Sequence, residues 1–533
     1  MSTFRISTRS KTRHNGRLSN SYIAETSTTE IIIGRSRATS VGIRIFLTCW
    51  LVFALHFATN TVREIYPALS LGDHLSFDVS EYAGLHPDIF ELMGRGSFIN
   101  NNPGASMIGA VPYILFRPVT DRLIDRVKQA RAAQGVGQDA EYNSIYPMAR
   151  EFYRVAREKG FDVKFGLAAG IMAVFAMAPI SAFGAVVMFW VFSSITHSTR
   201  TAAALSLIYA FATPIFYRTA QLNQNVLLAN FALFSFALLW RPWKKDEGQP
   251  FYFLAGLAAG FTVVLDYSGI VAAAVLAGYA LYRWMQSSGN DRRFSSLVRF
   301  AAGGAICGLI LMAYQWSSFG NPILPAQSYM PPANFTDLGY RGFSLPSTDL
   351  LLETAFGMRY GLFTSAPILL LVFAIPLWAR RNTRLLEKPE LIFIAAFTLL
   401  FFIFCSANQY GRMQFGTGVR HIVPVVPFVF ILAANVLIRM PKLPAALITA
   451  MATYWSWCLV MYRDVEQGFG VFESIRHVTL EGFRLPWLTT LERMGFVQDA
   501  TPLPLFFIAA VILLILWSFP FNPTNNDTIE TNV

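Results

Sequence analysis

One polar stretch of this chain carries enough carboxylates to perform acid–base chemistry. It runs "TVREIYPALSLGDHLSFDVSEYAGLHPDIFELMGRGSFINNNPG" from Thr61 to Gly104, and its acidic residues are Glu64, Asp73, Asp78, Glu81, Asp88 and Glu91. A carboxylate held at an aqueous surface can act as a general base or bind a divalent cation. Asp78 stands out, because "SFDVSEY" lies where an extended segment turns toward Tyr82. The alternative is a solvated loop whose acids have no chemical role.

A second stretch, "YGRMQFGTGVRHIVPVVPF", combines basic side chains with glycines. Arg412 precedes the glycine-rich turn, and Arg420 and His421 follow it. A guanidinium group matches the geometry of a phosphate, and glycine lets backbone N–H groups approach an anion. The pattern therefore predicts an anion site, and the alternative is a set of side chains that reach toward lipid headgroups.

Isolated polar residues between apolar segments add further candidates. Asp266 in "VVLDYSG" is either a functional carboxylate or the cap of the following helix. Asn223 in "QLNQN", Arg341 in "DLGYRGF" and Arg359 in "GMRYGLF" could bind a phosphate or a sugar beside it.

The composition assigns these groups to a membrane protein. Of the 533 residues 54% are hydrophobic and 14% are charged, whereas about a quarter is usual in soluble domains. The formal charge of +11 does not indicate nucleic acid, because the basic residues occupy short linkers between apolar segments. The four cysteines lie in apolar runs without the spacing of a zinc site, so we expect no disulfide framework.

The apolar segments predict an all-α integral membrane fold with about twelve transmembrane helices, by the usual length of a spanning segment. They cover residues 42–62, 164–195, 201–217, 222–240, 250–265, 267–284, 300–318, 361–379, 390–407, 421–439, 444–462 and 503–520.

The basic linkers predict the orientation of these spans. With the basic tail 1–41 in the cytoplasm, the linkers "HSTR", "RPWKK", "RWMQSSGNDRR", "ARRNTR" and "RMPK" also fall inside. This holds only if the short apolar helix at 105–117 does not cross, so we expect it to lie at the outer surface or to be re-entrant. The transmembrane core then covers 42–463 with a long outer loop at 63–163. An outer loop at 464–502, the last span at 503–520 and a cytoplasmic tail at 521–533 follow.

Five segments, taken in their order along the chain, carry a resemblance to a known family. They are "NTVREIYPALSLGDHLSFDVSEY", "NNNPGASMIGAVPY", "FATPIFYRTAQLNQNVLLANFALFSFALL", "QWSSFGNPILPAQSYM" and "FGTGVRHIVPVVPFVFIL". In this order the chain resembles the GT-C superfamily of polytopic membrane glycosyltransferases, in particular the bacterial relatives of the dolichyl-phosphate-mannose–protein mannosyltransferases and the aminoarabinose transferases.

The resemblance implies transfer of a sugar from a polyprenyl-phosphate-linked donor to a lipid, glycan or protein acceptor on the outer face. It implies catalytic carboxylates at Asp78, Asp88 and Glu64, and a phosphate-binding arginine at Arg420. Asn102 stands where the family usually has a basic residue. A divalent metal is an open alternative. We expect the three acids and Arg420 to converge on one outward-facing cavity.

The resemblance also implies a multi-pass protein of a bacterial inner membrane with both termini in the cytoplasm. Two other functions stay open at this point. One is a transporter or flippase for a lipid-linked or anionic solute, which would need polar groups along a path through the membrane. The other is a non-catalytic relative that only binds lipid carriers. None of the three involves nucleic acid.

Overall fold

The computed structural model describes residues 39–133, 142–144, 146–244, 250–287, 294–332, 336–378, 386–414, 417–462 and 470–518. Within these ranges the chain is mostly helical, as the all-α prediction requires, with one small antiparallel hairpin of β1 (Ile89–Leu92) and β2 (Gly96–Ile99). The predicted tails and the linkers "RWMQSSGNDRR" and "ARRNTR" lie wholly or mostly outside the described residues.

Each predicted span falls on a helix or on a run of short helices. The first is the helix Thr39–Leu55. The others are α5 (Asp162–Met172) continued through η2 (Ala173–Met177) into α6 (Ala178–Thr196), α7 (Thr199–Phe211), α9 (Gln224–Trp240), α10 (Tyr252–Leu265), α11 (Gly269–Gln286), α12 (Phe294–Phe319), α14 (Leu362–Ser365) with η6 (Pro367–Ala374) and α15 (Ile375–Trp378), α16 (Lys388–Ala407), η8 (Val423–Val425) with α17 (Val426–Leu437), α18 (Lys442–Met461) and α21 (Leu503–Ser518).

Four of these helices are long and apolar enough to cross a membrane: Asp162–Thr196, Phe294–Phe319, Lys388–Ala407 and Lys442–Met461. Shorter apolar helices, among them Gln224–Trp240 and Leu503–Ser518, accompany them in the described part of the chain. The helices thus indicate a membrane protein, and the count of twelve spans stays a prediction.

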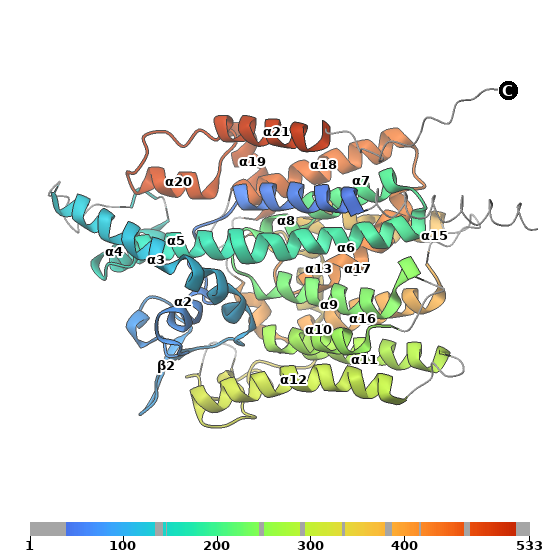
Figure 1. The fold of residues 1–533 in the computed structure, drawn as a ribbon, viewed down its shortest axis with the longest axis horizontal. Coiled ribbons are helices and arrows are strands. Elements are labelled where there is room, and N and C mark those ends of the chain that lie inside the picture. The colour runs from blue at the N-terminus through green and yellow to red at the C-terminus, as the bar shows by residue number, and fades with distance from the viewer. Residues whose placement is uncertain are drawn as a thin grey trace, which may run out of the picture.

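The long helices lie side by side, and the polar segments gather at one end of this bundle (Figure 1). That end, on the left of the view, carries α2 (Ile65–His74), β2, α3 (Gly104–Ala133), α4 (Pro147–Glu158) and α20 (Pro486–Arg493). The opposite end carries α15. Residues from the two predicted outer loops, 63–163 and 464–502, therefore meet at the same end.

The prediction of a short helix at 105–117 is wrong about the length of that helix. The structure has one continuous helix, α3, of 30 residues, which contains Pro112 and Pro118. Its second half consists of helix-forming residues of both charges, and Arg131 near its end pairs with Asp162 at the start of α5 at 2.8 Å. The apolar half is thus the first part of a longer helix that is anchored at both ends.

Glycines set the distance between α10 and α12. A Cβ atom added at Gly256 would lie 1.9 Å from the carbonyl oxygen of Phe300, and one added at Gly303 would lie 2.4 Å from that of Phe253. Gly260 and Gly304 also face each other across the same interface. Such close approach through small residues is typical of helices packed in a membrane, where van der Waals contact replaces the hydrophobic effect.

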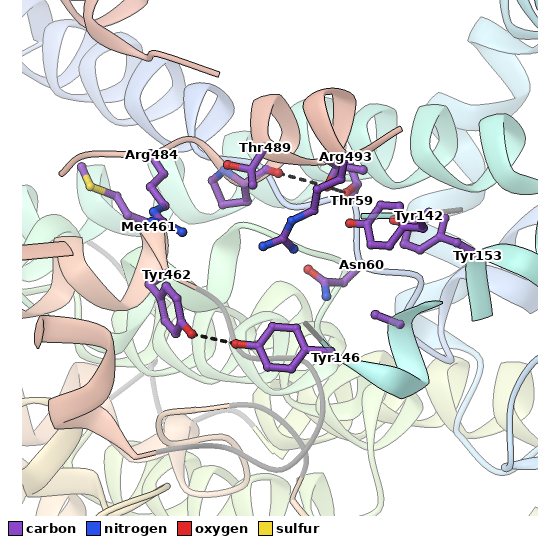
Figure 2. A pocket seen from close by; sticks show the side chains of 13 residues that line it. Thr59, Asn60, Tyr142, Tyr146, Tyr153, Met461, Tyr462, Arg484, Thr489 and Arg493 are labelled. Atoms are coloured by element: carbon purple, nitrogen blue, oxygen red, sulfur yellow. Dashed lines mark hydrogen bonds between the residues drawn. The ribbon is translucent and has the colours of Figure 1, made fainter. Parts of the chain in front are cut away.

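A cavity of about 630 Å³, its solvent-open mouth included, lies at the polar end of the bundle (Figure 2). Thr59 and Asn60, residues of α4, the end of α18 and residues of α20 surround it. Only residues 61–64 separate Asn60, in the wall of this cavity, from the start of α2 at Ile65.

Packing of α10 on α12 predicts that Gly256→Ala lowers the free energy of unfolding by about 1–3 kcal/mol, because the added methyl group meets backbone that cannot move aside. Gly308→Ala in α12 is the matched control, because a Cβ atom there meets no atom within 4 Å. Unfolding of both variants in mixed micelles measures the difference, and equal stabilities would contradict the packing.

The predicted orientation of the bundle can be tested by labelling single introduced cysteines. The four native cysteines are buried and should not react. Cysteines at Met93, which is 94% exposed, and at the exposed Glu492 should react with an impermeant maleimide from one side of the membrane. A cysteine at Lys442, in the predicted inner linker, should react only from the other side. Labelling of Met93 and Glu492 variants from opposite sides would refute the topology.

Candidate functional site

Five charged residues from four separate segments meet at the polar end of the bundle, and we call them the rim cluster: Arg63, Glu64, Asp88, Asp266 and Arg420. The Arg63 guanidinium lies 3.2 Å from the Glu64 carboxylate and 3.4 Å from that of Asp88. Asp266 and Arg420 lie within electrostatic range of Arg63. The rim cluster thus contains three carboxylates and two guanidinium groups.

The side chains of the rim cluster differ in how much of their surface solvent reaches. The side chain of Glu64 is 3% exposed, that of Arg63 18% and that of Asp88 32%. Both acids pair with Arg63. The Glu64 carboxylate does so from the buried side, whereas that of Asp88 faces solvent. Asp88 is therefore the carboxylate that an external hydroxyl group can reach.

The two arginines differ in how well they are paired. Burial lowers the pKa of Arg63, but Glu64, Asp88 and Asp266 together raise it above its ordinary value. The pKa of Arg420 is lowered, by burial first and by the positive charge of Arg63 second. Among the described residues, no hydrogen bond or ion pair reaches the guanidinium of Arg420. An anion beside Arg420 would relieve this unfavourable burial of charge.

Hydrogen bonds from neighbouring helices position the acids. Ser106 at the start of α3 donates to the carbonyl of Glu64 at 2.8 Å. Asn102, just before α3, donates to the carbonyl of Val263 at 2.7 Å and so joins this segment to the end of α10. Asp266 follows α10, and its carboxylate accepts from Gln224 at 2.8 Å.

The carboxylate of Asp266 also accepts from the backbone N–H of Ser268 at 2.8 Å, where α11 begins. The contact lies just before α11, whose N-cap residue is Ser268, so Asp266 braces the turn that leads into the helix, and it contributes negative charge to the rim cluster as well.

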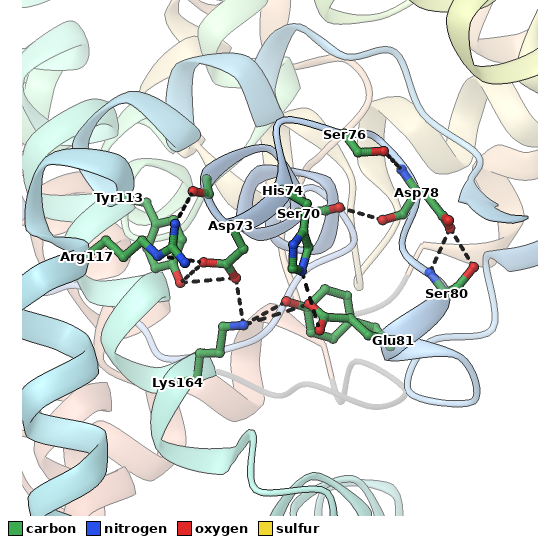
Figure 3. A network of polar contacts seen from close by, with 12 residues as sticks. Ser70, Asp73, His74, Ser76, Asp78, Ser80, Glu81, Tyr113, Arg117 and Lys164 are labelled. Atoms are coloured by element: carbon green, nitrogen blue, oxygen red, sulfur yellow. Dashed lines mark hydrogen bonds and ion pairs between the residues drawn. The ribbon is translucent and has the colours of Figure 1, made fainter.

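A buried ion-pair network holds α2, which directly follows Glu64 (Figure 3). Asp73 near the end of α2 is 7% exposed and lies 2.7 Å from the ammonium of Lys164 and 3.2 Å from the guanidinium of Arg117. Tyr113 donates a further bond to Asp73 at 3.1 Å. Since Lys164 belongs to α5 and the other two partners to α3, Asp73 clamps three helices together.

The glycine-rich turn before Arg420 is built differently from the expected anion site. The N–H of Gly418 donates to the carbonyl of Arg359 at 2.7 Å, and that of Val419 donates to the hydroxyl of Ser365 at 3.0 Å. These two donors are therefore occupied by the protein. The carbonyl of Val419 instead accepts from the buried Arg218 at 2.7 Å.

Arg218 in α8 (Pro214–Thr219) is a buried arginine next to this turn that the sequence analysis did not single out. Its guanidinium also donates to the carbonyls of Thr417 and Gly418, at 3.3 Å and 2.5 Å. Burial and the charge of Arg420 lower the pKa of Arg218 to about 10. A lone arginine between two apolar segments was the pattern that could have identified it.

Asp78 does not converge on the rim cluster through any contact of the described residues. Its carboxylate accepts from the N–H groups of Ser80 and Ser97, each at 3.0 Å, and from the hydroxyl of Ser80 at 2.5 Å. Ser97 belongs to β2, so Asp78 fastens the hairpin to the segment before it. Asp78 thus makes its contacts apart from Glu64 and Asp88, and the expectation that all three acids share one cavity stays a prediction.

The other predicted binding residues are divided between the rim cluster and its surroundings. His421 lies near the positive charges of Arg420, Arg63 and Arg218. Asn223 accepts bonds from Asn225 and Val226 and caps α9 next to Gln224.

Three arginines point to protein partners away from the cluster. Arg412 donates to Gln409 at 3.0 Å, Arg341 donates to the carbonyl of Gln327 at 2.7 Å, and Arg359 donates to that of Gln414 at 3.4 Å. Arg63 and Arg218 are instead the arginines whose charges act on Arg420 or are affected by it.

His86 belongs to the same polar stretch as Asp88 and contacts it. Its Nδ1 accepts from the N–H of Asp88 at 3.0 Å, and burial lowers its pKa, which favours the neutral ring that this bond requires. In the described part of the chain no group of three or more His, Cys, Asp or Glu side chains is arranged to hold a metal ion. The acids of the rim cluster are accompanied by arginines instead.

Comparison of the chain with protein-family models, with curated proteins and with solved structures finds no match. Function is therefore inferred from the geometry of the rim cluster.

The Asp73 network predicts that Asp73→Asn lowers the free energy of unfolding by about 3 kcal/mol, because it neutralises the buried carboxylate that Lys164 and Arg117 share and leaves Lys164 only the more distant Glu81, at 3.8 Å. Asp121→Asn is the control, since Asp121 pairs with the same Arg117 but is 53% exposed, and we expect a loss of under about 1 kcal/mol. Denaturant titration in micelles measures both, and similar losses would contradict the role assigned to Asp73.

Proposed function

We propose that the chain is a membrane glycosyltransferase that moves a sugar from a polyprenyl-phosphate-linked donor to a lipid, glycan or protein acceptor. The observation that carries the proposal is the partnerless guanidinium of Arg420 beside three carboxylates at one end of the bundle. Transfer from a glycosyl phosphate needs a cation for the leaving group and a base for the acceptor. The rim cluster offers both within electrostatic range of each other.

In the proposed reaction the acceptor hydroxyl oxygen attacks the anomeric carbon of the donor sugar. The bond between this carbon and the phosphate oxygen breaks, and the departing lipid phosphate takes up its electron pair next to Arg420. Asp88 accepts the proton of the hydroxyl group, because it is the most exposed carboxylate with a resolved contact to Arg63. Glu64 holds Arg63 in place from the buried side.

The proposal includes a bacterial inner-membrane location, twelve spans and cytoplasmic termini, with the polar end of the bundle facing outward. In that orientation a lipid tail can approach sideways from the bilayer while the sugar remains in water. Polar residues gathered at one end favour transfer at a membrane surface over transport, since a transporter needs polar groups near the midplane.

The test is transfer of a labelled sugar from a polyprenyl-phosphate donor in membranes that contain the full chain. We expect Asp88→Asn to lower the rate by about 10²–10⁴-fold, the usual contribution of a general base. Arg420→Gln should lower it by about 10²-fold or more, because the leaving-group charge is no longer stabilised. Glu91→Gln is the matched control, since this exposed acid lies in the same loop but outside the cluster.

Full activity of both Asp88→Asn and Arg420→Gln would refute the proposed site. Donor binding by the wild type without any transfer would identify a carrier-binding protein instead, and would refute the enzymatic part of the proposal.

A further inference from the structure

The cavity at the polar end has a lining that differs from the rim cluster in chemistry. Four tyrosines, Tyr142, Tyr146, Tyr153 and Tyr462, contribute rings and hydroxyl groups to its wall. Tyr146 and Tyr462 join their hydroxyl groups across it at 2.7 Å (Figure 2). Tyrosine offers an apolar face together with a polar tip, which suits ligands that combine C–H and O–H groups.

The cavity also carries positive charge. Arg484 and Arg493 line it, and no acidic residue does so in the described part of the chain. Arg484 pairs with Glu481, so its charge is balanced. The guanidinium of Arg493 has no hydrogen-bond or ion-pair partner among the described residues and points with the amide of Asn60 into the space (Figure 2).

A short stretch of chain connects this cavity to the rim cluster. Asn60 lines the cavity, and Arg63 and Glu64 follow it after only two residues. The backbone turns tightly here, with the N–H of Val62 bonded to the carbonyl of Asn60 at 3.0 Å. Four residues span at most roughly 14 Å, so a molecule in the cavity lies near the proposed reaction centre.

We propose that this cavity is a second binding site, which takes a sugar that carries a negative charge. Arg493 binds the anionic group, Asn60 and the paired hydroxyl groups of Thr59 and Thr490 bind sugar hydroxyls, and the tyrosines contact the ring. The inference that the cavity binds such a sugar depends only on the residues that line it. Its role as the acceptor site rests on the proposed glycosyltransferase function.

The test is calorimetric titration of the full chain in nanodiscs with glucose 1-phosphate, glucuronate, glucose and inorganic phosphate. The two anionic sugars should bind at least about tenfold more tightly than glucose or phosphate, because only they engage both Arg493 and the hydroxyl-binding groups. Arg493→Gln should abolish the preference for anionic sugars. Arg476→Gln, at a side chain that is 66% exposed on α19 (Val471–Glu481), should leave it unchanged.

Asn60→Asp provides a second variant that changes charge without changing size. It should weaken binding of the anionic sugars about tenfold while glucose binding stays the same. Phosphate that binds as tightly as glucose 1-phosphate would overturn the inference, because the site would then recognise only the anion.

Two further results separate this inference from the proposed function. Loss of sugar binding in Arg420→Gln but not in Arg493→Gln would place the ligand in the rim cluster and overturn the inference, while the proposed function would stand. Binding that depends on Arg493 in a chain without transfer activity would support the cavity and refute only its role as an acceptor site.

Discussion

The balance of buried charge around Arg63 is the constraint on which the polar end depends. A guanidinium and a carboxylate removed from water must find partners, since the cost of leaving either one unpaired reaches several kcal/mol. Arg63 meets this requirement with Glu64, its neighbour in the chain, and with Asp88, which lies 25 residues further along. The pairing therefore fixes the path of the chain between the first helix and the hairpin. It also leaves the second arginine, Arg420, with carboxylates nearby but none in contact.

The scaffold around these charges is built from further polar contacts at the ends of helices. Asp73 clamps α2 to α3 and α5, and Arg218 holds three successive carbonyls of the turn before Arg420. Both contacts occupy groups that would otherwise be unsatisfied in an apolar bundle. Side chains fixed by such partners keep their geometry before a substrate arrives, which reduces the ordering cost of binding.

The rim cluster and the tyrosine-lined cavity divide the polar end into two chemical environments. One combines three acids with two arginines, and the proposed transfer depends on that combination. The other combines tyrosine hydroxyls with an arginine and contains no acid among its described lining residues. The segment from Thr59 to Glu64 belongs to both, so a change in its backbone would affect the two sites together.

The sequence by itself determined the helical class, the positions of the apolar segments and the grouping of polar residues in particular loops. Hydrophobic length and composition are local properties, so no knowledge of the fold was needed for them. Residue type and position singled out Asp78, Asp266 and Arg420, whereas the resemblance to a known family added Glu64 and Asp88.

Only the tertiary structure decided which of these residues meet. It bonded the Asp78 carboxylate to the N–H of Ser97 in the hairpin, and it paired the carbonyls of the glycine-rich turn with Arg218. It also extended α3 through Ala133, where Arg131 reaches Asp162. Such pairings join residues far apart in the chain, and the free energy of a buried charge depends on partners that no local pattern specifies.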